Sequence, residues 1–135
     1  MGAGYKELTV WQKAKDVAVF VYRISGEGVL SKDFGLRDQI RRSAVSVASN
    51  LAEGDERDTD KDSVRFFFMA KGSLAELRTQ IQITYEVAQM EKSTYEKLES
   101  QCGILGKMIG SLIQAQLRAP RPSPRAPRPA RPKGI

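Results

Sequence analysis

Arginine side chains cluster in the stretch from 37 to 54, which is the part of the chain best suited to chemistry. Arg37, Arg41 and Arg42 lie within six residues of one another. A guanidinium group presents a planar fork of N–H donors that fits phosphate or carboxylate oxygens. Together with Lys71, these residues are candidates for binding the phosphates of a nucleic acid or an acidic partner.

Other polar residues follow in the same stretch at helical spacing. Ser46, Asn50 and Glu53 stand at positions i, i+4 and i+7, which places them on one face of a helix. Two interpretations compete: a hydrogen-bonded cluster that fixes helix register or subunit orientation, or part of a phosphate site. The residue types favour the structural interpretation for Asn50, Glu53 and Glu76, whereas the role of the arginines stays open. The predicted structural cluster comprises Ser46, Asn50, Glu53, Ser73 and Glu76.

The residue types that usually carry catalysis are scarce. The chain has no histidine and a single cysteine, Cys102, so the commonest general base and the commonest metal ligand are missing. The acidic residues between 55 and 62 crowd a loop and a first helical turn, without the glycine of a calcium-binding loop. There is no phosphate-cradling glycine loop. We expect no enzymatic activity, no metal and no cofactor, with Cys102 as a buried structural thiol.

The excess of positive charge lies at the C-terminal end of the chain. The formal net charge is +6, but residues 1–118 carry 17 basic residues against all 16 acidic ones. All six prolines and five basic residues fall in 119–135, so we divide the chain into a body, 1–118, and a basic tail, 119–135. The proline content favours extended polyproline conformers, and either nucleic-acid binding or a solvated, disordered tail fits this composition. The candidate binding residues of the tail are Arg121, Arg125, Arg128 and Arg131.

The body has the pattern of four helices. It contains no proline, and no stretch shows the sustained alternation of strands. We predict helices at 10–24, 36–53, 60–90 and 94–117. Capping boxes at Thr9–Gln12 and Ser93–Glu96 would begin the first and fourth helices, and a left-handed Gly54 would end the second.

Apolar residues along the two long helices alternate at spacings of three and four. This is the pattern of helices packed at about 20° in a bundle. Together with the short loops, it predicts an all-α, antiparallel up-down-up-down four-helix bundle. The predicted seams are Phe67, Ala70, Leu74, Leu77, Ile81, Thr84 and Ala88 in the third helix, and Tyr95, Leu98, Cys102, Leu105, Ile109, Leu112 and Gln116 in the fourth.

Several helices carry more apolar surface than one seam needs, for example at Val19, Phe68 and Ile104. This excess predicts a homo-oligomer, although a wide seam in a thick monomeric core is the alternative. No apolar run approaches the roughly 20 residues of a membrane span. Residues 1–6 lack a signal-peptide pattern, so we expect a cytoplasmic protein without membrane contact.

Three blocks of the chain, at 8–14, 40–54 and 67–77, resemble the four-helix-bundle proteins encoded in 23S rRNA intervening sequences. The accessory variability determinant of diversity-generating retroelements is similar to the same group. The resemblance implies a homopentameric ring without enzymatic activity, and in the retroelement relatives binding to a reverse transcriptase and nucleic acid. The residues that match the family blocks are Arg41, Arg42, Asn50, Glu53, Gly54, Gly72, Ser73 and Glu76.

Two functions follow as hypotheses. The first is a non-enzymatic oligomeric protein associated with RNA, DNA or a ribonucleoprotein, which the family resemblance and the arginines of the second helix and the tail favour. The second is a protein-interaction scaffold, such as a reverse-transcriptase accessory subunit, without direct contact to nucleic acid. The nearly neutral body departs from the strongly basic retroelement members and weakens the case for nucleic-acid binding by the bundle itself.

Overall fold

The computed structural model describes residues 4–118, which form helices joined by short connections. The long helices are α1 (Thr9–Ser25), α2 (Phe34–Asp55), α3 (Asp60–Glu86) and α4 (Lys92–Arg118). Two short 3-10 helices, η1 (Gly4–Glu7) and η2 (Leu30–Lys32), precede α1 and α2. No strand occurs in this part of the chain, which confirms the all-α, four-helix prediction. The predicted tail and its four arginines lie outside the described residues.

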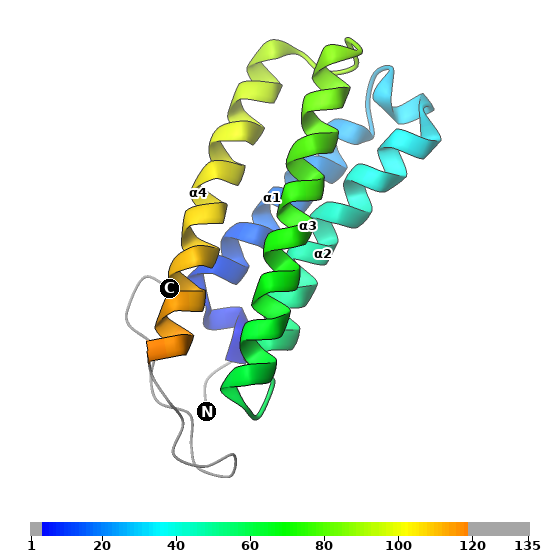
Figure 1. Cartoon of the computed structure of the whole chain (residues 1–135). Coiled ribbons are helices and arrows are strands. Elements are labelled where there is room, and N and C mark those ends of the chain that lie inside the picture. The colour runs from blue at the N-terminus through cyan, green and yellow to red at the C-terminus, as the bar shows by residue number, and fades with distance from the viewer. Residues whose placement is uncertain (1–3, 119–135) are drawn as a thin grey trace.

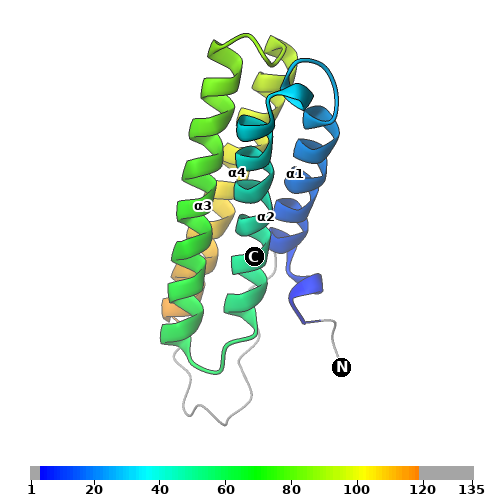
Figure 2. The same cartoon turned by 90° about the vertical axis from the view of Figure 1, so that its right-hand side faces the viewer.

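The four long helices lie side by side in one elongated bundle (Figures 1 and 2). Each helix runs back along the one before it. The α1–α2 and α3–α4 connections therefore lie at one end of the bundle, and the α2–α3 connection lies at the other. The end of α4 and the start of α1 also lie at the α2–α3 end (Figure 1).

The core follows the predicted seams closely. On α3 the seam is buried from Phe67 to Thr84, and on α4 it is buried from Leu98 to Gln116. Ala88, the last predicted seam residue of α3, is instead exposed beyond the end of that helix. The largest fully buried side chains are Phe67, Ile40, Leu51, Leu77, Ile81, Leu98, Leu105, Ile109, Leu112, Val10, Val17 and Val21.

Both predicted capping boxes are wrong. Thr9 already lies inside α1, because Gln12 N donates to Leu8 O and extends the helix backward by one residue. The Gln12 side chain donates instead to the backbone oxygen of Lys6, at 2.8 Å. Ser93 lies inside α4, which begins at Lys92.

The side-chain caps occur on the other two helices. Asp33 Oδ1 accepts from Leu36 N at the start of α2, at 3.2 Å. Thr59 Oγ1 accepts from Asp62 N at the start of α3, also at 3.2 Å. Each bond satisfies a helix-start donor that has no partner within its own helix.

The predicted helix ends also differ at two points. Gly54 is a buried helical residue of α2 and not a left-handed end, and it lies against the Phe67 ring of α3. Helix α3 ends at Glu86, four residues before its predicted end. There Ala88 adopts the left-handed φ of 60°, and Gln89 N donates to Thr84 O at 3.0 Å, which closes the helix in a Schellman motif.

Candidate nucleic-acid interface

Two of the predicted arginines of α2 pair with exposed aromatic rings near the α1–α2 connection. The Arg37 guanidinium lies 4.8 Å from the centroid of the Phe34 ring, and that of Arg41 lies 4.6 Å from the centroid of Tyr22. Phe34 is 63% exposed and Tyr22 is 48% exposed. We call Tyr22, Phe34, Arg37 and Arg41 the arginine–aromatic strip. It joins the last turns of α1 to the first turns of α2.

Hydrogen bonds hold Arg41 in place within the strip. Its Nε donates to Ser25 Oγ at 2.8 Å, and its Nη2 donates to Tyr22 O at 3.4 Å. Ser25 is fully buried at the end of α1, so the bond anchors the guanidinium to the bundle. A side chain that is already ordered loses less conformational entropy when it binds a ligand.

Arg37 is held in a similar way at the start of α2. Its Nε donates to Asp38 Oδ1 at 3.0 Å, and its Nη1 donates to Ser31 O at 3.2 Å. A guanidinium has five N–H donors, so donors remain for a ligand. The adjacent Asp38 carboxylate offsets part of the positive charge.

The other two predicted binding residues of the body stand apart from the strip. Arg42 is exposed on α2, and its side chain forms no hydrogen bond or ion pair within residues 4–118. Lys71 is exposed on α3, where its Nζ lies 6.0 Å from the Phe68 ring centroid. In the described chain no contact joins Lys71 to the arginines of α2, so the structure does not bring the predicted basic residues into one site.

The aromatic partners of the basic residues are the feature that sequence reasoning missed. Phe34 stands three residues before Arg37, a helical spacing that could have indicated the pair. Tyr22 belongs to a different helix from Arg41, so only the packing of α1 on α2 brings them together. The Phe66 ring similarly has two guanidinium groups near its centroid, Arg57 at 4.4 Å and Arg65 at 4.7 Å.

Three of the five residues of the predicted polar cluster meet between α2 and α3. Ser46 Oγ and Ser73 Oγ share a hydrogen bond of 2.8 Å across the two helices. Asn50 Nδ2 donates to Ser46 O at 2.9 Å and to Ser46 Oγ at 3.1 Å. Glu53 lies outside this group and forms an ion pair of 2.7 Å with Arg57. Glu76 is exposed on α3, with no contact to the cluster in the described part of the chain.

An apolar groove runs between α1 and α2 and continues the strip along the bundle. It has a volume of about 510 Å³, and Tyr22 belongs to both features. Trp11 lies near one end of the groove, where its ring packs against Tyr5 with the centroids 5.1 Å apart. The groove is lined by Tyr5, Trp11, Lys15, Ala18, Val19, Tyr22, Arg23, Val45, Ala48, Ser49 and Ala52.

The chemistry of the remaining candidate groups is limited. Burial raises the pKa of the Cys102 thiol to about 11, and the nearby Glu99 carboxylate acts in the same direction. Such a thiol is a poor nucleophile because little thiolate forms near neutral pH. Within residues 4–118, no three His, Cys, Asp or Glu side chains are placed to hold a metal ion. Over the same residues, no helix has the length and apolar character of a membrane span.

The fold and this surface define a small four-helix bundle that presents arginine–aromatic pairs beside an apolar groove. The chain belongs to the 23S rRNA-intervening sequence protein family, whose model matches residues 6–111. A solved structure with the same fold is a protein of unknown function from the S23 ribosomal protein family of Bacteroides thetaiotaomicron. It is 19% identical, with a TM-score of 0.68 over 78% of this chain and 99% of that chain. No curated protein matches the sequence.

Proposed function

We propose that this antiparallel up-down-up-down bundle, with its basic tail, is a non-enzymatic oligomeric protein associated with RNA or a ribonucleoprotein in the cytoplasm. The observation that carries the proposal is the arginine–aromatic strip, in which exposed rings and ordered guanidinium groups share one surface. The family description points to the same partner, because it refers to intervening sequences of 23S rRNA.

The strip suits RNA for a physical reason. Unpaired bases stack on aromatic rings and on the flat face of arginine, while the remaining N–H donors reach phosphate oxygens. Phe34 and Tyr22 are half to two-thirds exposed, so a base can reach their rings. Arg42 and Lys71 add positive charge elsewhere on the body, and Arg121, Arg125, Arg128 and Arg131 add it through the tail.

The oligomeric part of the proposal rests on the apolar groove. Val19 and Val45, from α1 and α2, are about 40% exposed on its walls, and Trp11 lies near one end. A second copy of the chain would cover these side chains, and the family resemblance implies five copies in a ring. Native mass spectrometry tests this part, and a clean monomer at micromolar concentration would refute it.

RNA binding is tested by fluorescence anisotropy with the full-length protein and a structured RNA that carries a single-stranded loop. We expect binding that weakens as salt rises, because bound phosphates release counterions. Replacing Phe34 with alanine should weaken binding by roughly fivefold or more, since a stacked base contributes about 1–3 kcal/mol. Phe68→Ala is the matched control, because Phe68 is also an exposed phenylalanine but lies on α3, outside the strip. Absence of binding at low salt would overturn the proposal.

The apolar groove also favours the second candidate function, a scaffold that binds a protein partner such as a reverse transcriptase. Its lining is largely alanine, valine and aromatic, which suits a protein surface better than a phosphate backbone. Partners that remain bound after nuclease treatment and at high salt would favour this function over RNA binding.

A further inference from the structure

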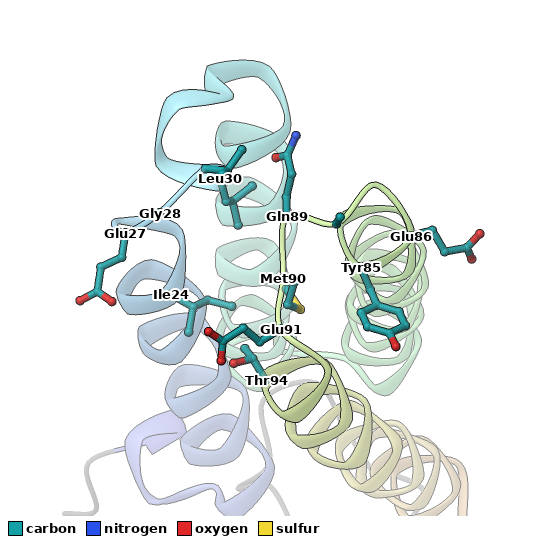
Figure 3. A pocket seen from close by; sticks show the side chains of 12 residues that line it. Ile24, Glu27, Gly28, Leu30, Tyr85, Glu86, Gln89, Met90, Glu91 and Thr94 are labelled. Carbon is teal, nitrogen blue, oxygen red and sulfur yellow. The ribbon is translucent and has the colours of Figure 1, made fainter.

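A second cavity lies at the end of the bundle that carries the α1–α2 and α3–α4 connections. Its volume is about 810 Å³, and it shares no residue with the arginine–aromatic strip. Figure 3 shows Glu91 and Thr94 turned toward Ile24, between the end of α1 and the start of α4. The lining residues are Ile24, Glu27, Gly28, Val29, Leu30, Tyr85, Glu86, Ala88, Gln89, Met90, Glu91 and Thr94.

The charged side chains that line this cavity are all negative. Three glutamates, Glu27, Glu86 and Glu91, line it, and none of the lining residues is basic. Glu27 and Glu86 extend outward on opposite sides of the opening, whereas Glu91 lies near its middle (Figure 3). The C-terminal ends of α1 and α3 border the cavity with partial negative charge, and the N-terminal end of α4 borders it with partial positive charge, so the carboxylates decide the sign. A cation is therefore the ligand that the cavity favours.

The arrangement of the acidic groups favours an organic cation over a metal ion. In residues 4–118, which include this cavity, no three carboxylate, imidazole or thiol groups are placed to hold a metal ion. Its inner wall is instead apolar, formed by Ile24, the buried Leu30 and Met90. An apolar stem packs well on such a wall, while a charged end reaches the carboxylates.

A hydrogen bond between distant parts of the chain holds one wall of the cavity. Gln89, in the α3–α4 connection, donates from Nε2 to Asp33 Oδ2 at the start of α2, at 3.2 Å. This bond fixes the connection against α2, so this wall is formed before a ligand binds.

We propose that this cavity binds a protonated amine or guanidinium on an apolar stem, with Glu91 as its main ionic partner. Two sources offer this chemistry: a free polyamine, and a lysine or arginine side chain of a protein partner. The inference is independent of RNA binding by the strip, because the two surfaces have no residue in common.

The test is a titration of the full-length, isotope-labelled protein followed by NMR. The probes are spermidine, the capped peptide acetyl-Ala-Arg-Ala-amide, and 1,8-octanediol as an uncharged stem. We expect saturable shifts of the Gly28 and Glu91 amide signals with spermidine, with the peptide or with both, and none with the diol. Saturable shifts with spermidine alone would identify a free polyamine as the ligand. Saturable shifts with the peptide alone would identify a side chain of a protein partner.

Charge variants decide whether the carboxylates bind the probe. The double variant Glu27→Gln and Glu91→Gln should weaken binding roughly fivefold, as expected for two partly exposed ion pairs. Glu76→Gln removes the same kind of charge from an exposed position outside the cavity and should leave binding unchanged. Circular dichroism checks that each variant is folded. Absence of saturable shifts with both charged probes, equal binding of the diol, or equal weakening by Glu76→Gln would overturn the proposal.

Discussion

Gly54 shows how one missing side chain sets the distance between two helices. A Cβ atom at this position would lie 2.5 Å from Phe67 Cε1 and 3.0 Å from the backbone oxygen of Ser63. We therefore expect Gly54→Ala to lower the free energy of unfolding by about 1–3 kcal/mol, because α2 and α3 must move apart. Gly72→Ala is the control, since a Cβ there meets nothing within 4 Å. It should raise stability by up to about 1 kcal/mol through helix propensity. Urea unfolding measures both, and a neutral Gly54→Ala would contradict the close approach.

Cys102 should make the stability of the bundle depend on pH in the alkaline range. Its thiol has a pKa of about 11 in the folded protein, against 9.0 ordinarily, so the folded state holds the proton more tightly than the unfolded state. The resulting stabilisation is complete below pH 9 and is lost as pH rises from 9 to 11. We expect a loss on the order of 2 kcal/mol over this range.

Other groups also titrate at alkaline pH, so Cys102→Ala is needed as the reference. Urea unfolding of both proteins at several pH values between 8 and 11 isolates the contribution of the thiol. The stability difference between the two proteins should shrink as pH rises. A difference that stays constant would show that the thiol does not titrate in this way.

At the scale of elements, the residue that follows the end of α3 adopts a backbone conformation that alanine does not favour. Ala88 has a φ of 60°, a left-handed conformation in which a side chain is strained and glycine is not. Ala88→Gly should therefore raise the free energy of unfolding by about 1 kcal/mol. Ala75→Gly, at an exposed position inside the same helix, should lower it by a similar amount. Thermal unfolding distinguishes the two signs, and destabilisation by both substitutions would argue against a left-handed Ala88.

The helices were predictable from the sequence because burial repeats along them. The seam residues from Phe67 to Thr84 repeat at spacings of three and four in the sequence, and all of them are buried in α3. The caps were less predictable, since Thr9 and Ser93 have the right residue types but α1 begins one residue, and α4 two residues, earlier than predicted. Gly54 serves the close approach of α2 to the Phe67 ring of α3 and not a helix end, and a contact between two helices is not encoded in a local pattern.

Helical spacing predicted part of the polar cluster but not the arginine–aromatic pair between two helices. Ser46 and Asn50 share a face of α2, as their spacing indicates, and the bond to Ser73 then joins the two predicted halves of the polar cluster. Glu53 pairs with Arg57 because that residue lies one turn away on the same helix. The partnership of Tyr22 with Arg41 depends on how α1 packs against α2, so helical periodicity alone could not reveal it.

At the scale of the whole molecule, the excess of positive charge lies in the tail, whereas the arginine–aromatic pairs lie in the body. The tail holds five basic residues without an acid, whereas the body is nearly neutral. The body places its arginines beside aromatic rings, which suits selective contact with bases and phosphates together. The tail contributes charge alone, which suits attraction to any phosphate backbone. Strength and selectivity of the proposed RNA binding should therefore respond to different parts of the chain.

Replacing Arg121, Arg125, Arg128 and Arg131 with alanine in the full-length protein tests this division. If each arginine contacts a phosphate, the slope of log K against log salt should become shallower by about 3, because each contact contributes about 0.7–0.9. The same four positions changed to lysine should keep the slope, since the charge is retained. The preference for an RNA with an unpaired loop over a fully paired one should survive the alanine changes and fall in Phe34→Ala. Anisotropy titrations at four salt concentrations measure both quantities, and an unchanged slope would place the phosphate contacts on the bundle instead of the tail.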